Sequence, residues 1–204
     1  MSETTTKTVI DAPLRTLHAQ AGSAIGTWFG CALPDHFSSD WQAEYRAARE
    51  TVALIDKNYR SYLRFTGPDR VRYLNALLTN NIKDLATGRG IVSLFLNPQG
   101  RIVAEIETYA EPENLFCVSY AMIRETLVAA LDKFIIMDDV TLADETEIHG
   151  TLALEGPAAA SIIQKLTGTS LGSLSELSFQ EVTVGGIPCR LVKRSPGGVS
   201  GAEF

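Results

Sequence analysis

Positive charge and long apolar runs are both scarce in this sequence of 204 residues. Its 18 Lys and Arg residues are outnumbered by 24 Asp and Glu, so the formal net charge is −6. A surface that binds the phosphates of nucleic acid needs the opposite balance. No apolar run approaches membrane-spanning length, and the start MSETTTKTV lacks the basic-then-apolar order of a signal peptide. We therefore expect a cytoplasmic protein that binds neither nucleic acid nor membrane.

Cysteine is scarce as well, and the motifs of the common nucleotide cofactors are missing. Three cysteines and three histidines are scattered along the chain: Cys31, Cys117, Cys189, His18, His36 and His149. The odd number and wide spacing of the cysteines indicate neither a disulfide framework nor a CxxC metal pair. We interpret the histidines as structural and Cys117 as an inert core thiol, and we expect no metal site. The sequence has no GxGxxG or Walker motif, which disfavours the usual nucleotide enzymes.

The sequence does contain one long regular stretch, from Leu63 to Tyr109. Its pattern predicts a strand, a helix and a two-stranded hairpin, over residues 59–66, 68–78, 91–96 and 101–109. Gly67 permits a tight turn after the first strand, and Pro68 suits the first turn of a helix because its missing N–H costs nothing there. Residues 79–81 (TNN) favour caps and turns, and residues 97–100 (NPQG) are typical of a β-turn.

The second strand of this hairpin carries two carboxylates. Its alternation places Glu105 and Glu107 on the same face, and a purely structural strand does not need both. Glu105 is either functional, as a buried acid that binds a ligand or moves a proton, or an ordinary strand residue that is solvated or paired with Arg101. We expect Glu107 to be solvated. Tyr109 and Phe95 are expected in the core.

These elements indicate an α+β fold with mixed, largely antiparallel sheets and packed helices. The hairpin turn favours antiparallel pairing, although short strands that alternate with helices would also suit parallel βαβ units. Further helices are expected from the N-cap candidates at 38–40 to about Ile55, and over residues 122–133. The order strand, Gly-Pro, helix occurs twice, at residues 65–68 and 154–157. It indicates two related units, unless so short a match is a coincidence.

We therefore divide the chain into three parts. Residues 1–20 are expected to be a flexible N-terminal segment. Residues 21–147 would form a first α+β domain, and residues 148–204 would form part of a second one. The chain ends at Phe204 directly after a strand-like start, so we expect that it is cut short.

Several motifs recur in a fixed order along the chain, and together they are more specific than any one of them. They are Glu44 and Arg49 before Ile55-Asp56, then Phe65-Thr66-Gly67-Pro68-Asp69, Leu78-Thr79-Asn80-Asn81, Gly88, and Asn97-Pro98-Gln99-Gly100-Arg101-Ile102. Over residues 20–204 this order resembles the family of the glycine-cleavage T-protein (aminomethyltransferase) and the YgfZ-type folate-binding proteins. The resemblance implies a tetrahydrofolate site in a ring-like, multi-domain α+β protein. It also implies a third, β-rich domain that these 204 residues lack.

The resemblance names candidate site residues. The T-protein has an Asp on the hairpin strand that meets the folate nitrogen, and the nearest acid here is Glu105, so Glu105 is the predicted catalytic residue. The predicted folate-binding set is Thr79, Asn80, Asn81, Glu105 and Arg194. Three parts depart from the T-protein pattern. Glu105 is one methylene longer than the Asp, the Thr-Asn-Asp turn ends in an amide here, and the pterin-gripping Tyr-Thr-Gly-Glu segment is lost near residues 196–199. Without the family, Asn80 and Asn81 are cap and turn residues.

Three functions follow as hypotheses. The first is a folate-dependent aminomethyltransferase that receives its one-carbon group from a lipoyl-type carrier protein. The second is a non-catalytic YgfZ-type folate binder that supports iron–sulfur proteins. The hairpin sequence LNPQGRI is similar to this YgfZ-type branch. The third is a structural fragment that has lost its ligand.

Overall fold

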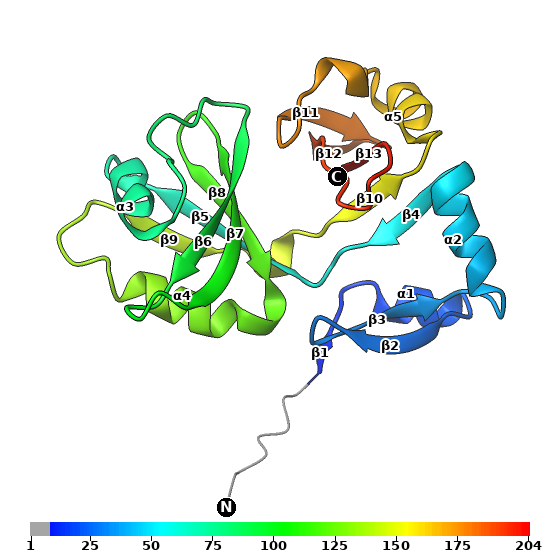
Figure 1. Ribbon diagram of the computed structural model, residues 1–204, viewed down its shortest axis with the longest axis horizontal. Helices are drawn as coiled ribbons and strands as arrows, with labels where there is room; N and C mark the ends of the chain where they lie inside the picture. The colour runs from blue at the N-terminus through cyan, green and yellow to red at the C-terminus, as the bar shows by residue number, and fades with distance from the viewer. Residues whose placement is uncertain (1–8) are drawn as a thin grey trace, which may run out of the picture.

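The computed structural model describes residues 9–204, which form three sheets and five α-helices (Figure 1). The strands of the small N-terminal sheet are, in spatial order, β1 (Ile10–Asp11), β3 (Cys31–His36) and β2 (Ala24–Trp28). Sheet 1 has the order β6 (Gly90–Leu96), β7 (Ile102–Ala110), β8 (Leu115–Tyr120), β5 (Arg60–Thr66) and β9 (Thr141–Asp144). Sheet 2 has the order β11 (Phe179–Val184), β12 (Ile187–Val192), β13 (Gly201–Glu203), β10 (Leu152–Glu155) and β4 (Ala53–Asp56). The α-helices are α1 (Arg15–Gln20), α2 (Trp41–Glu50), α3 (Arg70–Leu77), α4 (Arg124–Asp132) and α5 (Ala159–Thr167).

Sheets 1 and 2 are wholly antiparallel, and helices pack against them, so the predicted α+β class is confirmed. The one parallel pair among the described strands joins β1 to β3. The predicted hairpin is present as β6 and β7, closed by the turn at residues 97–100. Short turns of this kind force neighbouring strands to run antiparallel, which is why this part of the topology could be read locally.

The two large sheets are built alike, which confirms the two related units. In sheet 1 the strand before the Gly-Pro turn is β5, followed by α3, β6, β7 and β8; in sheet 2 it is β10, followed by α5, β11, β12 and β13. The registers agree as well. Thr66, just before its glycine, pairs with the first residue of β9, and Glu155, just before its glycine, pairs with the first residue of β4. Adding 89 to a residue number in the first unit from β5 to α3 therefore gives its counterpart in the second.

The two units exchange their edge strands. Strand β4 precedes the first unit in sequence but pairs with β10 in sheet 2, where it occupies the position that β9 has in sheet 1. Each of these edge strands also follows a helix, α2 before β4 and α4 before β9. Residues 53–56, within the segment 21–147 that we assigned to the first domain, thus complete the sheet of the second unit.

Glycine is required at both Gly-Pro turns. Gly67 has a φ of +95°, and a Cβ there would lie 2.2 Å from the carbonyl oxygen of Asp139. Gly156 has a φ of +141°, and a Cβ there would lie 2.5 Å from the carbonyl oxygen of Thr51. Side chains are strained at such φ values and would collide with backbone here, so only glycine lets the incoming chain pass this close.

The two faces of sheet 1 have different neighbours. Leu63 and Phe65 of β5 point into the main core, together with Leu74 of α3 and Leu127 and Leu131 of α4. The opposite face packs against sheet 2 through a second cluster, whose buried members are Tyr62, Tyr109, Phe116, Val118 and Val192. This face positions the site, because it brings polar residues of both sheets together.

Two local expectations were inaccurate. The helix expected to run to about Ile55 ends at Glu50, and residues 53–56 are strand β4, because pairing with β10 outweighs helix propensity there. Its N-cap is Asp40, whose side chain accepts a hydrogen bond from Ala43 N at 3.1 Å. Of the N-terminal segment 1–20, expected to be flexible, residues 1–8 lie outside the described part, and residues 9–20 contain β1 and α1.

Candidate functional site

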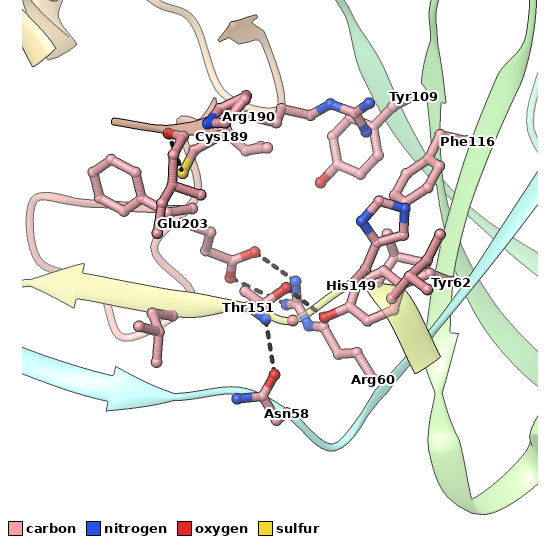
Figure 2. A pocket seen from close by; sticks show the side chains of 18 of the residues that line it. Asn58, Arg60, Tyr62, Tyr109, Phe116, His149, Thr151, Cys189, Arg190 and Glu203 are labelled. Carbon is pink, nitrogen blue, oxygen red and sulfur yellow. Dashed lines mark hydrogen bonds and ion pairs between the residues drawn. The ribbon is translucent and has the colours of Figure 1, made fainter. Parts of the chain in front are cut away.

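A cavity of about 790 Å³ lies between sheets 1 and 2. The walls come from both sheets and from the strand ends that connect them (Figure 2). From sheet 1 and its connections come Asn58, Arg60, Tyr62, Arg64, Tyr109, Glu111, Phe116 and Val118, and from sheet 2 and its connections come Ile148, His149, Gly150, Thr151, Leu152, Glu181, Ile187, Pro188, Cys189, Arg190, Val192, Glu203 and Phe204, with Pro13 and Leu14 at one end. A cavity of this volume can enclose a small organic molecule.

One wall of the cavity is aromatic. Tyr62 of β5 and Phe116 of β8 are stacked with ring centroids 6.0 Å apart, and His149 lies edge-on to Phe116 at 5.2 Å. The strand alternation of β5 directs Arg60, Tyr62 and Arg64 toward sheet 2 while Leu63 enters the core. Burial raises the pKa of Tyr62 to about 12, so its hydroxyl stays protonated at neutral pH and binds Thr151 Oγ1 at 2.6 Å.

Two arginines flank this aromatic wall. The guanidinium carbons of Arg64 and Arg190 lie 5.0 and 4.5 Å from the centroid of the Phe116 ring, which is the distance of a cation–π contact. Both arginines pair with Glu111, and Arg64 also pairs with Glu145 at 2.9 Å. Burial and the neighbouring Arg64 lower the pKa of Arg190 to about 10, so Arg190 remains cationic at neutral pH. The cavity wall therefore combines an aromatic face with arginines that are paired with carboxylates.

A buried ion network joins the sheets beside this cavity. Arg60 of sheet 1 donates to both carboxylate oxygens of Glu203 of sheet 2, at 2.5 and 3.1 Å, and also lies 3.6 Å from Glu107. Lys57 donates to Glu155 at 2.8 Å and to Glu203 at 2.9 Å. Burial alone would raise the pKa of Glu203, but Arg60 and Lys57 outweigh it and lower that pKa. The Glu203 carboxylate is therefore held as an anion by two buried cations.

The connection between the units adds polar groups. Asn58 Oδ1 accepts a hydrogen bond from Thr151 N at 3.0 Å, and Asn58 N and Nδ2 both donate to Asp56 Oδ1 at 2.7 Å. Gly150 approaches this asparagine closely, because a Cβ there would lie 2.7 Å from Asn58 Oδ1. These bonds hold together the two segments that lead into β5 and β10.

The predicted turn residues lie outside the cavity lining. Thr79 and Leu94 of β6 exchange hydrogen bonds, and Asn80 Nδ2 donates to Val92 O at 2.9 Å. Asn81 Nδ2 donates to Asp84 Oδ2 at 2.6 Å. The side chains of Thr79 and Asn80 thus hold the turn against β6, and that of Asn81 bonds within the following loop, as their residue types alone suggested.

Glu105 and Arg194 also lie outside the cavity lining. Glu105 is half-buried. The pKa of neighbouring Tyr120 is raised, first by the burial of Tyr120 itself and second by the negative charge of Glu105. Arg194 Nη2 forms an ion pair with Glu107 Oε1 at 2.8 Å, so of the predicted set it is the residue that joins the buried network.

Glu107 differs from its predicted state. The expectation that it is solvated was wrong: Glu107 is 6% exposed, forms an ion pair with Arg194, and accepts a hydrogen bond at 2.7 Å from the Tyr109 hydroxyl. Its face of β7 is covered by sheet 2, and a single strand sequence does not show such long-range cover. Tyr109 and Phe95 are buried as expected, and so is Cys117, whose pKa burial raises to about 12.

Sequence reasoning missed Tyr62, Phe116 and Arg190, because their strands look like ordinary core strands, and it interpreted His149, which lies between η2 (Thr146–Ile148) and β10, as structural. One signal was available for the first of them. The order Arg60, Tyr62, Arg64 puts two cations and an aromatic ring on one face of β5, and Leu63 and Phe65 lie on its opposite face. A strand face that is exposed to water does not need this combination.

Two general observations limit the chemistry of the described residues. Within residues 9–204 no group of three or more His, Cys, Asp or Glu side chains is placed to hold a metal ion. No helix of this part is long and apolar enough to cross a membrane. His18 instead pairs with Asp56 at 2.6 Å and His149 with Glu145 at 2.9 Å.

Similar proteins are known for nearly the whole chain. An aminomethyltransferase from Lysinibacillus sphaericus is 30% identical over 171 residues, which are 83% of this chain and 46% of the relative. One from Listeria welshimeri is 28% identical over 199 residues, 96% of this chain and 54% of the relative. The chain thus spans about half the length of these curated relatives.

The fold has solved counterparts. Glycine cleavage system aminomethyltransferase T from Bartonella henselae matches with a TM-score of 0.84 at 21% identity, over 96% of this chain and 53% of that one. A chain of heterotetrameric sarcosine oxidase from Corynebacterium sp. U-96 matches with a TM-score of 0.57 at 17% identity, over 79% of this chain and 80% of that one. The GCVT N-terminal domain matches residues 14–204. This chain therefore belongs to the GCVT N-terminal domain family, the family of the glycine-cleavage T-protein.

Proposed function

We propose that this chain is the folate-binding part of an aminomethyltransferase that transfers a one-carbon group to tetrahydrofolate. The observation that carries the proposal is the cavity of about 790 Å³ with an aromatic, arginine-bearing wall, in a chain of this family. The curated relatives named above are aminomethyltransferases, which does not favour the YgfZ-type alternative with its iron–sulfur clients.

The residues present suit such a ligand. Tetrahydrofolate combines flat ring systems with a carboxylate-bearing tail, and the cavity offers Tyr62 and Phe116 as ring faces. Arg190 lies over the rings of Phe116 and Phe179, at 4.5 and 4.8 Å. Within residues 9–204 its buried Nε has no hydrogen-bond partner, with Glu181 Oε1 3.6 Å away. A buried donor without a partner is costly, so an acceptor on a ligand that reaches this arginine would be favoured.

The chain's own residues would act by binding and by holding charge. Folate, when bound, supplies the nitrogen that accepts the one-carbon group. Arg190 and Arg64 would orient an anionic tail, and the aromatic wall would exclude water from the rings. Glu105, the predicted catalytic acid, would exchange a proton with an amine at its carboxylate. A lipoyl-type carrier protein would deliver the aminomethyl group, so the proposal includes a surface on which this carrier docks.

The two possible positions of the rings make the proposal testable by calorimetric titration with tetrahydrofolate under reducing conditions. If the rings stack in the cavity, Phe116→Leu should weaken binding about two- to tenfold, because a stacked pair contributes about 0.5–1.5 kcal/mol beyond its burial. The control is Phe134→Leu, since Phe134 is 45% exposed on the loop after α4 and is not part of the cavity lining. That control should leave the affinity unchanged.

If the rings instead meet Glu105, then Glu105→Gln should cost about 1–3 kcal/mol, because an amide donor would face a donor of the ligand. If only one of the two variants, Phe116→Leu or Glu105→Gln, loses affinity for tetrahydrofolate, the rings contact the residue that was changed in that variant. Wild-type protein that shows neither heat nor a rise in melting temperature at millimolar tetrahydrofolate would contradict the proposal for this chain.

A further inference from the structure

One carboxylate in the cavity lining holds two arginines. Glu111 Oε2 accepts a hydrogen bond from Arg64 Nη1 at 2.9 Å, and Glu111 Oε1 accepts one from Arg190 Nη2. Arg64 comes from sheet 1 and Arg190 from sheet 2, and all three residues line the cavity. The Glu111 side chain is only 15% exposed. A carboxylate held between two guanidinium groups is the arrangement that the anionic end of a ligand would adopt there.

Glu111 lies on a turn and not within a strand. Strands β7 and β8 pair as far as Ala110 and Leu115, and residues 111–114 connect them. Glu111 N donates to Asn114 O at 3.0 Å and closes the turn, and Asn114 Nδ2 donates to Glu111 Oε2 at 2.7 Å. Rotation of a side chain between its rotamers leaves the backbone in place. The Glu111 carboxylate can therefore leave the arginines without breaking a hydrogen bond of the sheet.

Both arginines have other contacts that hold them in place. Arg64 pairs with Glu145 at 2.9 Å and donates to Asn114 Oδ1 at 2.7 Å. Arg190 reaches from sheet 2 to the Phe116 ring of sheet 1, and its guanidinium carbon lies 4.5 Å from the ring centroid (Figure 2). The two guanidinium groups would thus keep their positions when Glu111 moves away, because these contacts do not involve Glu111.

Arg190 lacks acceptors for its donors. Among the residues that the structure describes, Glu111 is its only hydrogen-bond acceptor, and its buried Nε has none. Glu181 lies 3.6 Å from that Nε but is 70% exposed, so water screens its charge. Burial and the neighbouring Arg64 lower the pKa of Arg190 to about 10, because its positive charge is less well compensated than in water. A ligand carboxylate beside Arg190 would supply both an acceptor and the missing negative charge.

We propose that Glu111 occupies the place of a ligand carboxylate and competes with it for Arg64 and Arg190, so that Glu111 determines how strongly the cavity prefers an anionic ligand. This inference rests on the proposed function, which supplies the ligand: tetrahydrofolate, whose tail carries carboxylates. A competitor and a positioning residue have opposite effects when they are removed. Loss of a competitor tightens binding of the anionic tail, whereas loss of a residue that positions the arginines weakens it.

Calorimetric titration with two ligands under reducing conditions tests the competition. Tetrahydrofolate has the reduced pterin ring and the anionic tail, whereas tetrahydropterin has the same ring without the tail. Glu111→Gln should raise the affinity for tetrahydrofolate about tenfold, because it replaces an anionic competitor by a neutral one and removes its repulsion of the tail. The same variant should leave the affinity for tetrahydropterin unchanged, because this ligand has no carboxylate for the arginines.

The matched control is Glu145→Gln. Glu145 pairs with Arg64 at the same distance of 2.9 Å as Glu111 does, and its side chain is similarly buried, at 19% exposed. It is not part of the cavity lining, and its second partner is His149 instead of Arg190. The control removes the same charge without removing the competitor, so it should leave the preference for tetrahydrofolate over tetrahydropterin nearly unchanged.

Circular dichroism and melting curves would verify that both variants fold. If Glu111→Gln does not fold, Glu111→Asp replaces it. Aspartate keeps the charge but is one methylene shorter, so it holds the two arginines less well, and the affinity for tetrahydrofolate should rise at least about threefold. Arg190→Gln in the Glu111→Gln background should cancel the gain, because the tail then has only one arginine to bind.

The outcomes separate this inference from the proposed function. If wild-type protein binds tetrahydrofolate, a lower or unchanged affinity in Glu111→Gln, an equal rise for both ligands, or an equal rise in Glu145→Gln would overturn the inference and leave the proposed function intact. A rise for tetrahydrofolate alone, cancelled by Arg190→Gln, supports the inference. If wild-type protein and every variant bind neither ligand at millimolar concentration, the proposed function fails, and the inference fails with it.

Discussion

Replacing Glu107 by glutamine should destabilise this protein far more than replacing Glu105, although both lie on one face of β7. Glu107 pairs with Arg194 at 2.8 Å, accepts from the Tyr109 hydroxyl at 2.7 Å and lies 3.6 Å from Arg60. Glutamine keeps one carbonyl for Arg194 and can donate to the tyrosine, so the hydrogen bonds largely survive. The negative charge does not, and the Arg194 side chain is only 17% exposed.

The magnitude follows from that buried, uncompensated cation. Breaking a buried ion pair by removing one partner costs about 3–5 kcal/mol, and we expect about 3 kcal/mol here because Arg60 retains Glu203. Glu105 is half-buried and makes no side-chain hydrogen bond or ion pair within residues 9–204, so Glu105→Gln should change stability by less than about 0.5 kcal/mol.

Urea unfolding followed by circular dichroism measures the difference. With a slope of about 2 kcal/mol per molar urea, Glu107→Gln should lower the midpoint by about 1.5 M and Glu105→Gln by less than about 0.3 M. Equal shifts in the two variants would refute the reasoning, since they would mean that the buried network contributes no more than an ordinary strand residue. Glu107→Gln is therefore unsuitable as a neutral control for folate binding.

Three further predictions concern the turns, the pH response and the thiols. Gly67→Ala should lower the free energy of unfolding by more than about 2 kcal/mol, because the new Cβ collides with Asp139 O. Gly100→Ala should lower it by about 1 kcal/mol, because Gly100 has a φ of +76° but open space around it. Thermal melts of the two variants test the difference. Because Arg60 and Lys57 lower the pKa of Glu203, its contribution to stability is present above its unfolded pKa and is lost as pH falls through the lower folded value. Glu203→Gln should therefore be less stable at neutral pH but lose less stability below about pH 4.5 than wild type, and parallel pH profiles of urea midpoints would contradict this. Iodoacetamide should modify the half-buried Cys189 in native protein and reach Cys31 and Cys117 only after unfolding, because burial raises the pKa of both; mass spectrometry of the peptides would detect early labelling of Cys117 as a contrary result.

The sequence by itself determined those features whose causes are local. Gly67 and Gly156 mark strand-to-helix turns because only glycine tolerates their φ values, and the turn at residues 97–100 joins antiparallel strands because a short turn allows nothing else. Alternation placed Glu105 and Glu107 on one face of β7 correctly. The repeated Gly-Pro turns also revealed the two related units, and the ordered motifs indicated the family.

Only the tertiary structure decided what each face meets. The fate of Glu107 depends on sheet 2, which is built from residues at least 45 positions away, and no pattern within β7 encodes that cover. The same holds for the cavity, whose Phe116 and Arg190 come from different sheets and meet only after both have formed. Strand β4 was taken for the end of a helix because its pairing partner β10 lies almost 100 residues further along the chain. Local chemistry selects turns and alternation, whereas burial and charge pairing are set by contacts between distant segments.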